Sequence, residues 1–162
     1  MFGKVNNKRT RFKPGFLFKR DIFALMNAIH IEQIRHELTW KLRQKVLYPE
    51  QTIADVQMDE DTDGYHFAAF VDNYIVGVVS LFRKDDSFQF RKLAVDPSVQ
   101  NQGVGSRLLD YITDFAKNEG GIMLWCNARV TAIPFYIKHG FVHSGKLFTK
   151  NGFDYEILEK AL

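Results

Sequence analysis

Apolar and polar residues alternate along several short stretches of the chain, a period of two that is typical of half-buried β-strands. Strand-like stretches cover residues 28–34, 66–71, 74–82, 88–95, 122–126, 141–148 and 153–158. A period of 3.6 predicts helices over residues 37–47, 104–116 and 131–138. Interleaved elements of both kinds predict a single mixed α+β domain around a largely antiparallel sheet.

Turn residues join several of these stretches. Asp72-Asn73 separates strands 66–71 and 74–82, and Asn151-Gly152 separates the last two strands. Both dipeptides are typical of tight hairpin turns. Gly140 follows the helix 131–138 and is expected to end it in the left-handed conformation.

The stretch Gln100–Gly105 lies between a predicted strand and a predicted helix, and it reads Gln-Asn-Gln-Gly-Val-Gly. A glycine turn that opens a helix leaves free backbone N–H groups where the helix macrodipole adds partial positive charge. This arrangement favours the binding of a phosphate group. The alternative is an ordinary strand-to-helix turn whose glycines serve tight packing.

Two nucleotide-binding motifs do not fit this turn. A P-loop needs Lys and then Ser or Thr directly after its second glycine, and neither stands at its required position, since Ser106 and Arg107 follow Gly105. A dinucleotide fingerprint would place its third glycine at Leu108, and its acidic residue would fall at Glu119, which ends a helix and does not lie on a strand. The pattern that remains is Gln-x-x-Gly-x-Gly.

Two motifs in the same order resemble the GNAT family of N-acetyltransferases. The family's phosphate motif, Arg/Gln-x-x-Gly-x-Gly/Ala after small apolar strand residues, is similar to Leu93-Ala94-Val95 followed by Gln100–Gly105. Its second signature, Phe-Tyr-x-x-x-Gly-Phe, is similar to residues 135–141. The resemblance covers residues 28–158 and implies the GNAT fold, in which the central fourth and fifth strands splay apart.

The resemblance also implies the chemistry of the site, with acetyl-coenzyme A (acetyl-CoA) as acyl donor and no metal. The N–H of Val95 would stabilise the thioester oxygen as it gains negative charge, and Tyr136 would protonate the departing thiolate. A tyrosine that only packs over the sheet is the alternative for Tyr136. The implied donor-binding residues are Leu93, Ala94, Val95, Gln100, Asn101, Gln102, Gly103, Val104, Gly105, Ser106, Arg107, Asn127 and Arg129.

Three of these assignments stay open at the level of sequence. Arg107 could reach a phosphate or be a solvated surface residue. Many family members carry, where this chain has Arg129, an asparagine that bonds to the arm of the donor. Asn127 could take over that role or could only cap the strand end. Arg129 could instead contact a carboxylate on the substrate. The general base is unassigned, with Glu32, His66 and a bound water as candidates.

Composition agrees with one folded domain. The chain has 162 residues, of which 46% are hydrophobic and 15 are phenylalanine, so a full core is expected. No apolar run approaches the length of about 18 residues that a membrane span needs. The single cysteine, Cys126, excludes an intramolecular disulfide and is expected to fill the core. We therefore expect a cytoplasmic protein.

The net charge of +3 is unevenly distributed. Residues 1–25 contain seven Lys or Arg and one Asp, whereas the remaining 15 basic and 18 acidic residues give −3. This contrast predicts a basic extension over 1–25, outside a domain that covers 26–162. Such an arm could touch nucleic acid or an acidic membrane surface, although nucleic-acid binding is the weaker interpretation. Met26 could equally be an alternative start.

Asp59, Asp61 and Asp63, followed by Gly64, resemble the opening of a calcium loop. The twelfth position, which would have to supply a bidentate carboxylate, is Phe70. We therefore expect a solvated acidic loop and not a metal site. Such a loop could attract a cationic substrate.

The sequence thus predicts an N-acetyltransferase that moves acetyl from acetyl-CoA to a primary amine by direct attack, with Tyr136 as general acid. The acceptor could be a small molecule or a protein amine, and a homodimer is possible. The alternative is a non-catalytic acyl-CoA sensor or interaction module, which would keep the glycines but would not need Tyr136.

Overall fold

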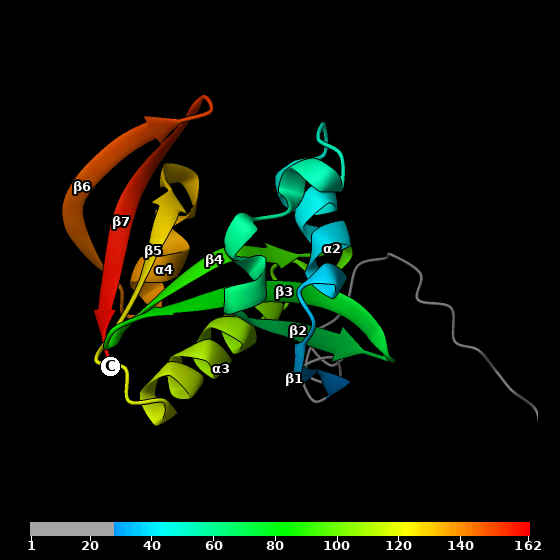
Figure 1. The fold of residues 1–162 in the computed structure, drawn as a ribbon, viewed down its shortest axis with the longest axis horizontal. Coiled ribbons are helices and arrows are strands. Elements are labelled where there is room, and N and C mark those ends of the chain that lie inside the picture. The colour runs from blue at the N-terminus through cyan, green and yellow to red at the C-terminus, as the bar shows by residue number, and fades with distance from the viewer. Residues whose placement is uncertain (1–27) are drawn as a thin grey trace, which may run out of the picture.

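The computed structural model describes residues 28–162, and these form one seven-stranded sheet with helices on both faces (Figure 1). The predicted extension 1–25 and Met26 lie outside the described residues. The strand order is β1-β2-β3-β4-β5-β7-β6, and only β4 and β5 pair in parallel. The predicted α+β fold with a mostly antiparallel sheet is therefore confirmed.

Most observed elements begin and end close to their predicted bounds. The longest departures are in the fifth and seventh strands, which each run three residues beyond their predicted ends at Cys126 and Leu158. The strands are β1 His30–Ile34, β2 Tyr65–Val71, β3 Tyr74–Lys84, β4 Ser87–Val95, β5 Met123–Arg129, β6 Val142–Lys150 and β7 Phe153–Ala161. The helices are α2 Glu37–Leu47, α3 Val104–Asn118 and α4 Ile133–Lys138, with short 3-10 segments η1 Ala54–Val56, η2 Asp59–Asp63, η3 Pro97–Val99 and η4 Val130–Ala132.

The alternation of side chains along the strands divides the core into two layers. Ala68 on β2 packs with Leu42 of α2 on one face. Phe67, its neighbour on β2, packs on the other face with Leu108 and Ile112 of α3. Burial of a leucine, isoleucine or phenylalanine side chain stabilises the fold by about 1.5–3 kcal/mol. None of the described helices is long and apolar enough to cross a membrane.

The predicted turns adopt the conformations that their residues favour. Asp72 and Asn73 have φ angles of 50° and 65°, and Asn151 and Gly152 have φ angles of 52° and 76°. Left-handed conformations at both central residues match the twist of the flanking strands. Gly140 has a φ of 83° just after α4, as predicted.

The prediction of a solvated acidic loop is wrong for Asp61. Its exposure is only 2%, because its carboxylate lies beneath α2. Both guanidinium nitrogens of Arg43 donate to its two oxygens at 2.8 Å, and the Trp40 indole donates at 3.0 Å. Burial opposes ionisation of Asp61, but these hydrogen bonds outweigh it and hold the pKa below its ordinary value.

His66, one of the candidate bases, belongs to the same buried network. Its Nε2 lies 2.7 Å from the carbonyl oxygen of Asp61 and its Nδ1 lies 2.8 Å from the Ser80 hydroxyl. Burial lowers the pKa of His66, so the neutral ring donates from Nε2 and accepts at Nδ1. The Ser80 hydroxyl in turn accepts from Arg43 at 2.7 Å. The network ties α2 and η2 to the sheet.

We predict that Arg43→Leu lowers the free energy of unfolding by about 3–5 kcal/mol, because it leaves the Asp61 carboxylate buried and unpaired. Denaturant unfolding measures this loss. Lys45→Met, on the same helix, removes the exposed Lys45–Asp96 ion pair and is the matched control, with an expected change of about 0–1 kcal/mol. Equal effects for the two variants would contradict the assigned role of the buried pair.

Candidate active site

The parallel pair β4–β5 ends after three residue pairs. Ser87, Phe88 and Gln89 face Met123, Leu124 and Trp125, and beyond this point the two strands diverge (Figure 1). The second half of β4, residues 90–95, therefore has a hydrogen-bonded neighbour, β3, on one edge only. An open edge of this kind presents backbone N–H and C=O groups that an extended ligand can pair with.

The direction of the backbone groups at the end of β4 follows from one hydrogen bond. The N–H of Asp96 donates to the carbonyl of Val76 on β3 at 2.8 Å. Successive N–H groups along a strand point to opposite edges, so the N–H of Val95 points toward the opening. On that same edge the Gln100 side-chain amide donates to the Val95 carbonyl at 3.0 Å.

The glycine turn lies directly after this strand end and opens α3. Gly103 is left-handed, with a φ of 86°, and precedes the first helical residue. The first backbone N–H to bond within the helix is that of Arg107, which donates to the Gly103 carbonyl at 3.0 Å. The N–H groups of residues 104–106 therefore have no acceptor within the helix. They are available to an anion at the positive end of the helix dipole.

The two glycines of the turn differ in what the fold demands of them. Gly103 needs its left-handed φ, which disfavours other residues. A Cβ at Gly105 would meet only Phe135 at 3.5 Å and Val95 at 3.6 Å, both ordinary van der Waals contacts. The fold itself therefore does not require glycine at position 105.

Tyr136 lies on α4 within a cluster of aromatic rings. Its ring centroid is 5.5 Å from that of Phe90 on β4 and 5.9 Å from that of Phe141. No described residue forms a hydrogen bond with its hydroxyl group. Burial, with a smaller contribution from the neighbouring Cys126 thiol, raises the pKa of Tyr136 well above its ordinary value of about 10. The phenol is therefore protonated throughout the neutral range.

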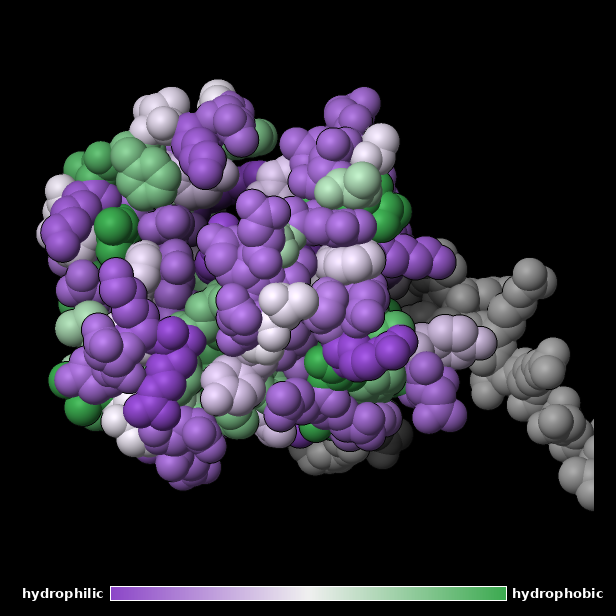
Figure 2. Space-filling model, viewed as in Figure 1, coloured by the Kyte–Doolittle hydropathy of each residue, from purple (hydrophilic) through white to green (hydrophobic). Residues whose placement is uncertain are grey.

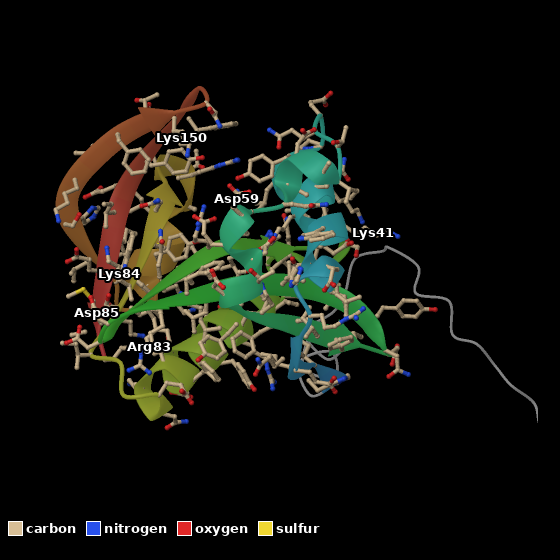
Figure 3. The ribbon with its side chains drawn as sticks, viewed as in Figure 1. Lys41, Asp59, Arg83, Lys84, Asp85 and Lys150 are labelled. Carbon is tan, nitrogen blue, oxygen red and sulfur yellow. The ribbon has the colours of Figure 1, made fainter. Side chains whose placement is uncertain are left out.

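A cavity of about 330 Å³ opens between the two halves of the sheet, where Figure 2 shows a notch with hydrophilic side chains at its rim. Its walls come from the loop after α2, from β4 and β5, and from the β6–β7 hairpin, whose end carries Lys150 (Figure 3). The lining residues are Tyr48, Gln51, Asp55, Phe90, Arg91, Lys92, Asn127, Phe148, Lys150, Asn151, Phe153 and Tyr155.

The structure brings most of the sequence-predicted residues around the divergence of β4 and β5. Residues 93–95 form the end of β4, and residues 100–107 form the glycine turn and the first turn of α3. Asn127 lines the cavity. Arg129 instead spans the opening, because its guanidinium donates to the Leu47 carbonyl at 3.4 Å and lies 4.0 Å from the Phe153 ring centroid.

The candidate bases Glu32 and His66 are not among the residues that line the cavity. Glu32 is on β1, the strand at one end of the sheet, and pairs with His30 at 3.5 Å. Cys126 is buried, as predicted, and burial raises the pKa of its thiol to about 12. Neither ring nitrogen of His66 is free, since both hold buried hydrogen bonds.

Sequence reasoning did not identify Tyr48, Asp55, Lys92 or Lys150, although all four line the cavity. Three of them lie in segments without a recognisable motif. Lys92 did carry a signal, since residues 88–91 alternate between apolar and polar and Lys92 is polar where the alternation requires an apolar residue. Lys92 sits in a β-bulge with a φ of 57°, where the register of β3 and β4 shifts.

Residues 33–162 match the family described as Acetyltransferase (GNAT) domain, and the chain belongs to that family. A ribosomal protein bS18-alanine N-acetyltransferase from Escherichia coli K12 is 30% identical over 117 residues, which cover 70% of this chain and 72% of that protein. An uncharacterized N-acetyltransferase, YitI of Bacillus subtilis, is 25% identical over 74% of this chain and 87% of its own length.

A solved GNAT acetyltransferase from Elizabethkingia anophelis, with acetyl-CoA bound, has the same fold. The TM-score is 0.66 and the identity is 22%, and the alignment covers 84% of this chain and 99% of that one. The family and the fold together make this protein a GNAT N-acetyltransferase.

We predict that Gly105→Glu weakens coenzyme A binding by about tenfold or more without lowering the melting temperature. Glutamate is a better helix former than glycine, and a negative charge near a helix N-terminus is favourable by about 0.3–1 kcal/mol. The same carboxylate would repel a pyrophosphate. Thermal unfolding and calorimetric titration with coenzyme A measure the two effects.

Gly105→Gln is the matched control, because it adds a side chain of the same length without the charge. It should weaken coenzyme A binding less than Gly105→Glu does. Unchanged coenzyme A affinity in Gly105→Glu would contradict a phosphate seat at this turn.

Proposed function

We propose that the protein transfers an acetyl group from acetyl-CoA to a primary amine by direct attack. The divergence of β4 and β5 beside the glycine turn supports this proposal most strongly, because it places an open strand edge next to a helix N-terminus. The acetyl-CoA in the Elizabethkingia relative and the amine acceptor named for the E. coli relative are consistent with it.

The donor is proposed to bind in two parts. Its pyrophosphate accepts hydrogen bonds from the N–H groups of Val104, Gly105 and Ser106, and the absence of a side chain at 105 permits close approach. Its pantetheine arm pairs with the open edge of β4 at Leu93–Val95, as an added strand would. The thioester then lies next to the Val95 N–H.

The amine nitrogen attacks the thioester carbonyl carbon and forms a tetrahedral intermediate. The Val95 N–H donates to the resulting oxyanion, whose negative charge it stabilises. The C–S bond then breaks, the thiolate takes the proton of Tyr136, and the nitrogen releases its proton to water. Tyr136 regains a proton from solvent, so the cycle leaves an N-acetyl amine and coenzyme A.

The raised pKa of Tyr136 has two consequences for this step. The phenol is protonated at every pH where an amine acceptor is reactive, so Tyr136 can always donate a proton. It is also a weaker acid than an exposed phenol, so its contribution belongs at the low end for general acid catalysis, about 10²-fold. The aromatic rings around it hold the hydroxyl in place.

Tyr136→Phe should therefore lower kcat by about 10²-fold and leave coenzyme A affinity nearly unchanged. Steady-state kinetics with an amine acceptor and calorimetry with coenzyme A measure the two quantities. Tyr111→Phe, at a partly exposed tyrosine on α3, is the matched control and should retain kcat. An unchanged kcat in Tyr136→Phe would remove the tyrosine from the reaction.

The pH dependence follows from the same group. Activity should rise as the amine acceptor loses its proton and should stay high to about pH 10, because Tyr136 does not ionise below that value. The measurement is kcat/KM between pH 6 and 10. A fall of kcat/KM between pH 8 and 9 that disappears in Tyr136→Phe would show that the phenol ionises at a lower pH than its burial predicts.

We further propose that the protein acts in the cytoplasm, since its one cysteine is buried and not paired. A homodimer remains a prediction. Binding of coenzyme A without turnover over a broad amine panel would favour a non-catalytic acyl-CoA sensor instead.

A further inference from the structure

The charges that line the cavity are unequal. Arg91, Lys92 and Lys150 are cationic, and Asp55 is the acidic lining residue. The Asp55 carboxylate is engaged by a neighbouring residue: it accepts hydrogen bonds from the Thr52 amide at 2.9 Å and from the Thr52 hydroxyl at 2.6 Å. The cavity next to the proposed transfer point is therefore positively charged.

Lys92 is the most unusual of these residues. It adopts a left-handed φ of 57°, which costs a residue with a side chain about 1–2 kcal/mol. Strain of this kind is concentrated at functional sites. The ammonium donates to the Tyr48 hydroxyl and lies 4.3 Å from the centroid of that ring. Within residues 28–162 no carboxylate forms an ion pair with it, although it is half-buried.

The two other cations complete one side of the cavity. Arg91 is 3.5 Å from the Glu60 carboxylate, so its charge is partly neutralised. Lys150 lies at the end of β6, opposite the loop after α2 (Figure 3), and it forms no ion pair with any residue of the described chain. Of the three cations that line the cavity, Lys92 and Lys150 form no ion pair with a carboxylate of residues 28–162.

The remaining wall is aromatic. The rings of Phe148 and Tyr155 are stacked on the β6–β7 hairpin, with centroids 5.2 Å apart and an angle of 9° between their planes. Phe90 lines the cavity and its ring contacts that of Tyr136, so Phe90 connects the cavity wall to the proposed proton donor. A molecule in this cavity would place an apolar surface on one side and an anionic group on the other.

We propose that the acceptor is a small primary amine that carries a carboxylate. Lys92 and Lys150 bind the carboxylate, and the apolar body of the molecule packs against Phe148 and Tyr155. A volume of about 330 Å³ lies at the lower end for small-molecule sites and suits an acceptor of amino-acid size. This inference rests on the proposed acetyl transfer and names its acceptor class.

Three probes with the same apolar body test the carboxylate: L-phenylalanine, L-phenylalaninamide and phenethylamine. With saturating acetyl-CoA, kcat/KM for the acid should exceed that for the other two by about 10- to 100-fold, the value of a hydrogen bond to a charged group. The amide's ammonium loses its proton more readily than that of the acid. A preference for the acid over the amide therefore cannot come from the basicity of the amine, so this pair is the decisive comparison.

Lys92→Met and Lys150→Met should each reduce the preference for the acid by about tenfold or more, with little effect on kcat/KM for phenethylamine. Lys146→Met, four residues before Lys150 on the same strand and outside the cavity lining, is the matched control and should keep the preference. Methionine keeps an unbranched side chain close to the length of lysine and removes its charge. Calorimetric binding of L-phenylalanine to the coenzyme A complex gives a readout that does not depend on turnover.

The outcomes separate this inference from the proposed function. Turnover of all three probes at equal rates, or a preference for phenethylamine, would overturn the carboxylate site and leave acetyl transfer intact. Turnover of acidic peptide N-termini but not of L-phenylalanine would overturn the small acceptor. An absence of both coenzyme A binding and turnover would instead refute the proposed function.

Discussion

The early end of pairing between β4 and β5 determines where every other part of the candidate site can lie. After three parallel pairs the strands separate, so the sheet divides into two wings, β1–β4 and β5–β7–β6. The three paired residues of β4 and β5 form the base that joins them. Backbone groups inside a protein need partners, so an open edge in the centre of a sheet is unfavourable unless solvent or a ligand satisfies it. The glycine turn and the cavity both lie at this opening.

Contacts away from the base fix how far the wings open. On one side the aromatic cluster of Phe90, Tyr136 and Phe141 packs beneath the divergence. On the other side Arg129 connects the end of α2 with the β6–β7 hairpin. The buried Arg43–Asp61 pair then holds α2 and the segment after it against the sheet. Residues far from the proposed chemistry thus define the shape of the cavity.

Features that depend on local sequence could be predicted, and features that depend on distant partners could not. The hairpin turns at 72–73 and 151–152 and the left-handed Gly140 follow from single dipeptides or residues. The burial of Asp61 depends on Arg43, 18 positions earlier, and no local pattern reports that pairing. The cavity walls come from four separate segments, and of the four lining residues that the sequence did not identify only Lys92, which breaks the alternation of its strand, carried a local signal.

The open edge of β4 is the proposed binding place of the acyl donor, and the Val95 amide hydrogen reports on binding there. Hydrogen exchange of this amide, followed by NMR with and without coenzyme A, is the decisive measurement. We expect exchange at Val95 to slow when coenzyme A binds, whereas Asp96, already bonded to Val76, should change little. Bound coenzyme A with unchanged exchange at Val95 would contradict the account.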